Sequence, residues 1–382
     1  MEVMILSIPK VVNPRCEYRK NPTGIDVIQP KLSWQIECNK RNTMQKAYRI
    51  QVSQNNDSFE NCVWDTGMVE SDISVHLQYS GEPLKSRMRY YYRVKIWDNN
   101  DNETGWSSTA FFEMGILNKN EWTAKWITAD FGYDKSTTSP CPMMRRTFHT
   151  AGKIKSVRIY ATALGLYELY LNGERVGDYL LTPGWTNYNK RLQYQTYDVT
   201  EMVNKGENTI GVVLGEGWYK GNLAWKNQRN ICGDKTAALV QMHIILEDGS
   251  EQVVVSDSSW KSSEGPIRKS ELYHGETYDA RLEKQGWKEA GYDDTDWQKT
   301  CELQQGKDIL TAQENEPIKA VNEIKPVSMF ETPQGDTVVD MGQNMVGYIN
   351  FNVKGEKGSR VILEHAEVLD SEGNFYTENL RS

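Results

Sequence analysis

Apolar and polar residues alternate over many short segments of the chain. In residues 90–96, YYYRVKI, every second side chain is large and apolar, and the side chains between them include an arginine and a lysine. Residues 31–37 and 47–53, KLSWQIE and AYRIQVS, are similar. This pattern is typical of strands with one buried face. Long segments with apolar residues at helical spacing are almost missing, so the sequence predicts an all-β chain.

A second group of strand-like segments occupies the middle of the chain: residues 156–163, 165–173, 191–200, 208–217 and 238–256. Tyr194 and Tyr197 fall on opposite faces of one strand, so at least one of them is predicted to be a core residue. The turn residues EDGS at 247–250 and NG at 172–173 predict β-hairpins. Residues 286–297, GWKEAGYDDTDW, carry three bulky rings among acidic turn residues and are expected to pack back over this unit.

A third unit is expected from about residue 319. Residues 336–355 and 359–369 are strand-like and are joined by a glycine turn. These strands have too few partners to close a sheet, so the unit is expected to be cut short. The expected divisions of the chain are residues 1–117, a linker at 118–139 anchored by Trp122 and Trp126, residues 140–305 and residues 306–382.

Length and charge narrow the class of protein. A chain of 382 residues is long enough for two or three domains with proper cores. The net charge of −8, without any block of lysine and arginine, argues against a nucleic-acid partner. No apolar run reaches the roughly 18 to 20 residues needed to cross a bilayer, so no membrane partner is expected.

The start of the chain and its cysteines bear on location. Residues 1–15, MEVMILSIPKVVNPR, combine an acidic second residue with a short apolar stretch, which is a poor secretory signal. A cytoplasmic protein is expected, with a periplasmic location as the alternative if a leader has been removed. The six cysteines form no CxxC pair and are expected to be free thiols. The sequence contains no HExxH, GxSxG or Walker-type motif.

Two segments combine aromatic rings with asparagines where the chain leaves regular strands. Pro183-Gly184 breaks a strand ahead of WTNYNK, and GWYKGNLAWKN begins at residue 217. Sugars are bound by rings that cover their apolar C–H faces and by amides that pair with their hydroxyls. The candidate carbohydrate-binding residues are Trp185, Asn187, Tyr188, Trp218, Tyr219 and Asn222. The alternative is that these rings plug the ends of a sandwich and the amides cap turns.

Several motifs occur in a consistent order: YLNGERVGDYLLTPGWTNYNKRLQYQTYDVT, LGEGWYKG, ELYHGETYDAR and VDMGQNMVGYINFNVKGEKGSRVILEHAEVLDSEGNFYTENLRS. This series resembles the non-catalytic N-terminal half of bacterial α-L-rhamnosidases. The tyrosine and tryptophan spacing of the first unit resembles a fibronectin type III or related immunoglobulin-like domain. The two resemblances imply tandem β-sandwiches: a fibronectin III-like sandwich at 1–117, a jelly-roll, carbohydrate-binding-module-like domain at 140–305, and a truncated β-sandwich of rhamnosidase type at 306–382.

The resemblance also implies a catalytic part that this sequence does not contain. In the family an (α/α)6 barrel follows these β domains and carries paired acids around an Asp-Cys-Pro-x-Arg-x-Glu-Arg motif, which is absent here. Inverting hydrolysis needs a proton-donating acid and a water-activating carboxylate roughly 6.5 to 9.5 Å apart. The acids of this chain lie in predicted turns, so we assign no catalytic residue and expect the chain alone not to hydrolyse rhamnosides.

Some members of the family bind terminal rhamnose with the help of calcium, which makes Ca²⁺ a candidate cofactor. Its candidate oxygen ligands are Asn187, Asn227, Asn230 and Asp234. In the motif HGETYDAR, Glu276 and Asp279 lie beside Tyr273 and Tyr278. This carboxylate pair could coordinate a cation, but we favour an interdomain or turn-stabilising role, with Arg281 as the nearest countercharge.

The sequence therefore predicts the accessory β portion of an α-L-rhamnosidase. We expect it to bind or position a rhamnose-containing glycan and to scaffold a catalytic barrel that this chain lacks. Two alternatives stay open. The chain is a piece of a whole rhamnosidase whose catalytic part lies downstream, or it is a purely structural β array that binds no sugar.

Overall fold

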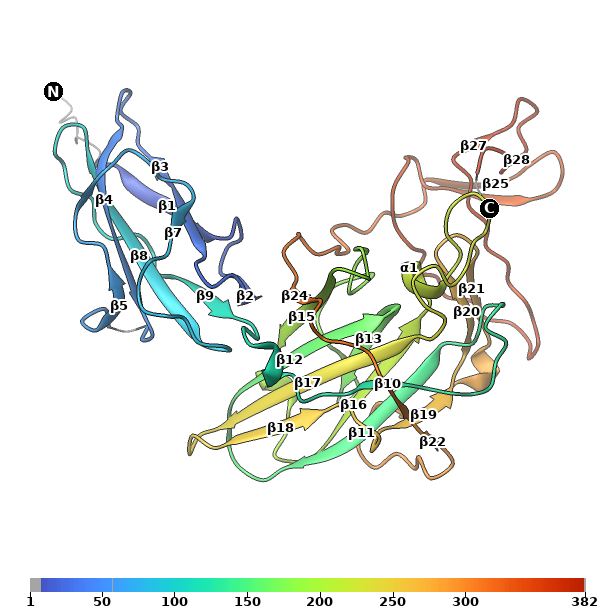
Figure 1. The fold of residues 1–382 in the computed structure, drawn as a ribbon. Coiled ribbons are helices and arrows are strands. Elements are labelled where there is room, and N and C mark those ends of the chain that lie inside the picture. Colours follow the sequence, from blue (N-terminus) through green and yellow to red (C-terminus); the bar gives the residue numbers. More distant parts are fainter. Residues whose placement is uncertain (1–7, 57, 381–382) are drawn as a thin grey trace.

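The computed structural model describes residues 8–56 and 58–380, which form two layered units and a C-terminal segment (Figure 1). Strands make up almost all the regular structure of these residues. Their helical part is one α-helical turn and three 3₁₀ turns: α1 (Gly217–Lys220), η1 (Lys119–Glu121), η2 (Thr200–Met202) and η3 (Ala280–Leu282). The predicted all-β class is confirmed. No helix within the described ranges has the length and apolar character that a bilayer span requires.

The N-terminal unit is a sandwich of two sheets. One has the strand order β1-β3-β7, formed by β1 (Lys10–Cys16), β3 (Lys31–Glu37) and β7 (Leu77–Gln78). The other has the order β2-β9-β8-β4-β5, with β6 beside β4: β2 (Thr23–Ile25), β4 (Gln45–Ser53), β5 (Cys62–Asp65), β6 (Val69–Glu70), β8 (Arg89–Asp98) and β9 (Ala110–Met114). Every second residue of β8 is buried, as the alternation predicted. Trp34, Tyr92 and Phe112 lie in the core between the sheets.

The second unit is a larger sandwich. One sheet has the order β23-β10-β17-β12-β15-β24, with β18 beside β17: β10 (Trp126–Thr128), β12 (Ile154–Leu164), β15 (Leu192–Asp198), β17 (Ala237–Leu246), β18 (Glu251–Val255), β23 (Cys301–Leu303) and β24 (Leu310–Ala312). The other has the order β14-β13-β16-β11-β19-β22: β11 (Pro142–Thr150), β13 (Leu166–Leu171), β14 (Glu174–Arg175), β16 (Gly206–Gly215), β19 (Lys261–Glu264) and β22 (Gln298–Lys299). Both predicted hairpins are confirmed, since β17 pairs with β18 and β13 with β14.

The outer face of the first of these sheets is covered by the linker. Tyr197 lies in the core between the sheets, whereas Tyr194 lies on the opposite face of β15. Trp122 covers Tyr194 there, with ring centroids 5.2 Å apart in an edge-to-face arrangement. Both tyrosines are therefore buried, which confirms the prediction that at least one belongs to a core.

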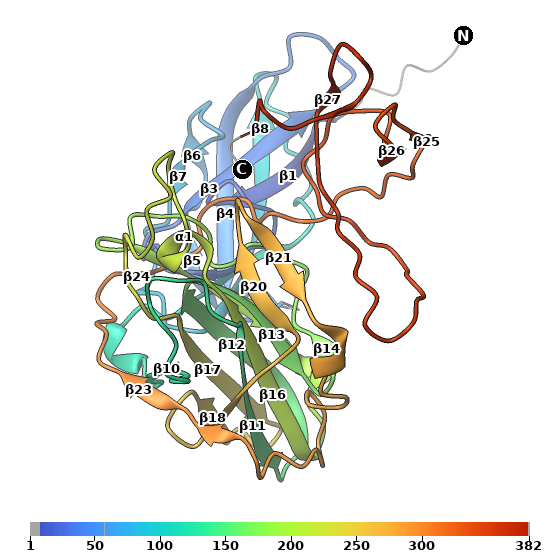
Figure 2. The ribbon, with the colours of Figure 1, turned by 90° about the vertical axis from the view of Figure 1, so that its right-hand side faces the viewer.

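The outer face of the other sheet is covered by residues 286–297. Trp287 and Trp297 are buried there and form an apolar cluster with Met143 of β11, as the sequence predicted for this segment. The hairpin of β20 (Ile267–Glu271) and β21 (Gly275–Tyr278) precedes the segment. Figure 2 shows this hairpin standing beside α1, above the layers of the sandwich.

The two sandwiches meet at a close interface. Glu113 at the end of β9 is buried and accepts two hydrogen bonds from Arg158 of β12, with Nε–Oε1 at 2.6 Å and Nη2–Oε2 at 3.0 Å. The backbone of Ile116 donates to the Tyr194 hydroxyl at 3.0 Å. A Cβ atom on Gly115 would lie 2.4 Å from that hydroxyl, so the two units approach too closely here for any side chain.

Residues 306–380 begin within the second sandwich, because β24 pairs in parallel with β15 beyond the boundary expected after residue 305. Two hairpins follow: β25 (Ser328–Glu331) with β26 (Thr337–Asp340), and β27 (Val368–Leu369) with β28 (Phe375–Tyr376). The strand-like residues 341–367 form no strand, and many of their apolar side chains are exposed. Within the described ranges, no buried apolar cluster includes a residue beyond Ala312, so this last unit is open.

Candidate functional site

Two loops of the second sandwich bring their tryptophans together: the first loop is residues 184–191 and the second is residues 216–236. Gly184, with φ +97°, turns the chain so that Trp185 leaves the strand direction, and Trp218 lies on α1. The two indoles stack, with centroids 5.7 Å apart and planes inclined by 5°. Trp185 is 61% exposed, whereas Trp218 packs partly against the apolar cluster beneath it. The pair therefore presents aromatic surface to solvent on a supported base.

Tyr188 and Tyr219 lie beneath this surface and are both buried. Their rings meet edge to face, with centroids 5.4 Å apart, and burial raises the pKa of both hydroxyls. The Tyr188 hydroxyl donates to the carbonyl of Gly184 at 3.0 Å, which steadies the turn ahead of Trp185. A Cβ atom on Gly233 would lie 2.2 Å from the Tyr219 hydroxyl. These two buried rings join the loops to each other. This is what the alternative interpretation predicts, in which the rings fill the end of the sandwich.

The two candidate asparagines are both engaged in hydrogen bonds, one within its own loop and one to a strand of the neighbouring hairpin. The side-chain oxygen of Asn187 accepts a hydrogen bond from the backbone of Asn189 at 3.3 Å. The side-chain amide of Asn222 donates to Glu271 at 3.1 Å, and its backbone N–H donates to the same carboxylate at 2.8 Å. The Asn187 contact is of the turn-capping kind that the sequence left open as the alternative, whereas Asn222 ties its loop to Glu271 of β20.

A buried ion-pair network holds the second loop, and sequence reasoning missed it. Arg229 bridges two carboxylates: its Nη2 lies 2.5 Å from Glu216 Oε2, and its Nη1 donates to Glu271 Oε1. Lys220 also pairs with Glu216, and the backbone of Ser139 donates to that carboxylate at 3.1 Å. The carboxylate side chains of Glu216 and Glu271 are only 3% and 1% exposed. Two negative and two positive charges therefore balance where water is nearly excluded.

The electrostatics of this network favour the charged forms. Burial disfavours ionisation of Glu216, but the hydrogen bonds and positive charges of Lys220 and Arg229 outweigh it and lower the pKa of this carboxyl. The same pairing raises the pKa of the Arg229 guanidinium against the effect of burial. The sequence indicates one ion pair of this network, because Glu216 and Lys220 are four residues apart, which is the spacing of neighbours on a helix. No spacing rule links Arg229 to Glu271.

The candidate calcium ligands are distributed over both loops. Asn230 donates to the carbonyl of Lys135 at 2.8 Å, and its side-chain oxygen is buried without a hydrogen-bond partner. Asp234 forms an ion pair with Lys135, which lowers the pKa of the Asp234 carboxyl. Asn227 has a left-handed backbone with φ 49°, while Asn187 belongs to the first loop. Over residues 8–56 and 58–380, no group of three or more His, Cys, Asp or Glu side chains could hold a metal ion.

The carboxylates of HGETYDAR do not act as a pair. Asp279 caps η3 and forms a two-pronged ion pair with Arg281, at 2.8 Å from Nε and 2.6 Å from Nη2. This arrangement lowers the pKa of the Asp279 carboxyl to about 2, and it confirms Arg281 as the countercharge in a turn-stabilising role. Glu276 lies on β21, opposite Ser270 of β20.

Three family models match successive parts of the chain. The Rha78A-like N-terminal immunoglobulin domain matches residues 11–118. The α-L-rhamnosidase N-terminal domain matches residues 152–322, and the bacterial α-L-rhamnosidase concanavalin-like domain matches residues 330–382. The match to 152–322 contains both tryptophan loops, and the match to 330–382 lies in the open C-terminal unit.

Curated relatives are also α-L-rhamnosidases. An α-L-rhamnosidase from Formosa agariphila is 33% identical across 93% of this chain, and one from Alteromonas sp. strain LOR is 33% identical across 95%. In each case the match covers 40% of the relative. The chain therefore spans about two fifths of the length of these relatives.

Solved structures agree in fold. The native α-L-rhamnosidase of Aspergillus terreus matches with a TM-score of 0.90 and 36% identity, over 97% of this chain and 42% of that one. The Streptomyces avermitilis α-L-rhamnosidase complexed with L-rhamnose matches with a TM-score of 0.92 and 27% identity, over 98% of this chain and 53% of that one.

Proposed function

Because this chain carries the N-terminal domains of the α-L-rhamnosidase family, we propose that it binds a rhamnose-containing glycan and positions it for a catalytic domain that these β domains scaffold. The observation that carries the proposal is the stacked pair Trp185–Trp218, whose outer ring is exposed. The Streptomyces avermitilis relative was solved with L-rhamnose, which supports the choice of ligand class.

The chemistry of the pair suits a deoxy sugar. Rhamnose has a methyl group where other hexoses have a hydroxymethyl group, and its ring presents C–H bonds that pack well on an aromatic face. Trp218 holds Trp185 in one orientation, so little side-chain entropy is lost when a sugar is bound. A neutral sugar also needs no basic surface, in keeping with the net charge of −8.

Calcium is the proposed cofactor of this site. The ion prefers oxygen ligands, and the buried side-chain oxygen of Asn230, which has no partner, offers one. The carboxylate of Asp234 would exchange its pairing with Lys135 for the ion. Asn187 and Asn227 are the remaining candidate ligands. A bound calcium ion would supply a point of coordination for sugar hydroxyls, while the tryptophans contact the apolar face.

The described residues are proposed to bind sugar without cleaving it. Glu216 and Glu271 are the most buried carboxylates near the tryptophan pair, and both are paired with Arg229 in a network of balanced charge. Both carboxylates are therefore engaged in ion pairs, and the lowered pKa of Glu216 does not suit the protonated acid that glycoside hydrolysis requires. In this proposal the chemistry belongs to a catalytic domain outside this chain.

A purely structural array is the second candidate, and specific contacts favour it. Tyr188 and Tyr219 are buried, while Asn187 caps its own turn and Asn222 donates to Glu271. Sugar contact would then fall to the tryptophan pair alone. A calorimetric titration with L-rhamnose, performed with calcium and again with a chelator, separates the two candidates. Binding that weakens in the chelator supports the site, and absence of heat in both supports the structural array.

A further inference from the structure

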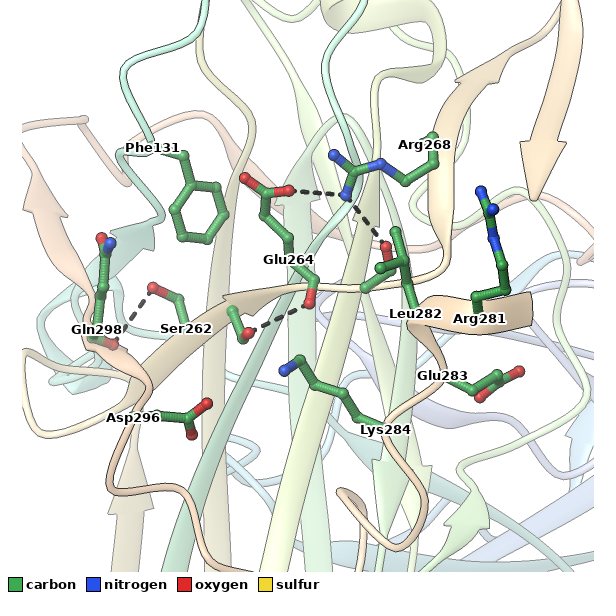
Figure 3. Close-up of a pocket in the computed structure, with 12 residues that line it drawn as sticks. Phe131, Ser262, Glu264, Arg268, Arg281, Leu282, Glu283, Lys284, Asp296 and Gln298 are labelled. Atoms are coloured by element: carbon green, nitrogen blue, oxygen red, sulfur yellow. Dashed lines mark hydrogen bonds and ion pairs between the residues drawn. The ribbon is translucent and has the colours of Figure 1, made fainter. Parts of the chain in front are cut away.

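A hollow of about 530 Å³ lies at the sheet edge formed by β19 and β22. Its lining residues are all different from those of the two tryptophan loops. They include Phe131, Ser262, Glu264, Lys284, Asp296 and Gln298. Figure 3 shows Phe131 and the Glu264 carboxylate in the upper part of the view, and Asp296 and Lys284 below them. One aromatic ring therefore faces a set of polar groups across an open space.

Some of the charged lining groups already have partners. Glu264 pairs with Arg268 at 2.7 Å and accepts a hydrogen bond from the Tyr133 hydroxyl. Arg281 is held by Asp279, which does not line the hollow. These groups shape the walls, and their ion pairs hold them in position.

Other polar groups of the lining are available to a ligand. Within the described chain, the carboxylate of Asp296 and the side-chain amide of Gln298 make no hydrogen bond. The ammonium group of Lys284 has no ion-pair partner there either, and lies 5.9 Å from the centre of the Trp297 ring. The base of the hollow is part of the sheet, since it includes the buried residue Ser262 of β19. Hydrogen-bond acceptors and donors, which include a carboxylate, an amide and an ammonium group, thus surround a space that is open to solvent.

We propose that this hollow is a second saccharide-binding site, which takes a neutral pyranose. The ring of Phe131 would cover a C–H face, while Asp296 and Gln298 would pair with hydroxyls on the other side. The charges that lack partners are Asp296, Glu283 and Lys284, so the free groups carry one net negative charge. That balance disfavours uronic acids and other anions.

The site extends the proposed function and does not rest on it, because the two sets of residues are separate. Two sugar contacts on one domain would let a branched or polymeric glycan bind at two points. The second contact would then be intramolecular, so overall affinity for such a glycan exceeds that for a single sugar.

The test uses the 382-residue chain with Trp185→Ala as background, which removes the outer ring of the tryptophan pair. Saturation-transfer difference NMR is recorded with methyl α-L-rhamnopyranoside and methyl β-D-galactopyranoside at millimolar concentration. We expect transfer from at least one of these glycosides in this background. We expect Asp296→Ala combined with Gln298→Ala to weaken that binding about tenfold, as loss of two hydrogen bonds predicts.

Phe131→Leu keeps apolar bulk but removes the flat ring, and it is expected to reduce transfer to the C–H protons of the sugar. Lys299→Ala, next to Gln298 on β22 but outside the lining, is the matched control and should leave transfer unchanged. The proposal is overturned if the Trp185→Ala background gives no transfer with either glycoside. It is also overturned if Asp296→Ala with Gln298→Ala has no effect, or if D-galacturonate binds more tightly than both neutral sugars.

Discussion

Trp185 and Trp218, from two different loops, stack with their ring centroids 5.7 Å apart and their planes inclined by only 5°. The outer indole is 61% exposed, although a ring of this size is usually kept from water. Beneath them, Tyr188 and Tyr219 join the same two loops through buried rings. The arrangement is a supported aromatic surface, and its rigidity depends on contacts outside the surface itself.

Removal of Arg229 should unfold the second loop. Arg229→Ala leaves Glu216 and Glu271 buried with too little positive charge, a change that costs about 3–5 kcal/mol in buried pairs. Chemical denaturation measures the free energy of unfolding. The control is Arg281→Ala, which breaks an exposed pair and should leave that free energy nearly unchanged. Equal effects of the two substitutions would contradict the role assigned to the network.

The pH dependence of stability should carry a contribution from His243. Burial and the nearby Arg87 lower the pKa of this imidazole, although Glu251 at 2.7 Å acts in the opposite sense. Below the ordinary histidine pKa of about 6.5, the unfolded chain therefore binds a proton that the folded chain does not. This contribution to stability is complete above that pH and is lost progressively as the pH falls below it.

Denaturation at pH 7.5 and pH 5.5 measures this difference. His243→Gln should reduce it, whereas His149→Gln, at an exposed position of β11, should leave it unchanged. A pH profile of His243→Gln identical to that of the parent chain would show that the imidazole between the two sandwiches does not contribute.

The contact between the two sandwiches should not tolerate a side chain at Gly115. Its Cβ would lie 2.4 Å from the Tyr194 hydroxyl, so Gly115→Ala must displace either the ring or the first sandwich. Overpacking of this kind costs about 1–3 kcal/mol. Thermal unfolding should therefore shift to lower temperature in Gly115→Ala. In Gly105→Ala, where nothing lies within 4 Å of the added carbon, the shift should be much smaller.

The chain alone should not cleave rhamnosides. In the proposed function the catalytic acids belong to a domain outside these 382 residues, and the buried carboxylates Glu216 and Glu271 are engaged in ion pairs with Arg229. We expect the 382-residue chain to release no 4-nitrophenol from 4-nitrophenyl α-L-rhamnoside above the buffer rate. Turnover that persists through purification, and that disappears in Glu216→Gln or Glu271→Gln, would contradict this expectation.

The strands were predictable because their pattern is local. β8 shows the alternation of buried and half-buried residues that its sequence predicts, and the hairpins at 172–173 and 247–250 follow from their turn residues. The strand-like residues 341–367 are different. They form no strand in the described chain, because a strand needs a neighbour to take up its backbone hydrogen bonds.

The candidate site was predictable only in part. The break at Pro183-Gly184 correctly indicated that Trp185 lies on an exposed connection. Neither the burial of Tyr188 nor the Arg229–Glu271 contact has a local signal, since each depends on how distant segments pack. Burial of Tyr194 also depends on tertiary structure, because the linker residue Trp122 covers a face that the strand pattern leaves open.

Calorimetric titration with methyl α-L-rhamnopyranoside tests the central claim most directly, in the parent chain, in Trp185→Ala and in Trp225→Ala. Trp225 is 84% exposed in the second loop but does not belong to the stacked pair, so it is the matched control. We predict a dissociation constant on the order of millimolar in the parent chain, at least about tenfold weaker binding in Trp185→Ala, and no change in Trp225→Ala. No binding by the parent chain, or equal binding by all three proteins, would contradict the account.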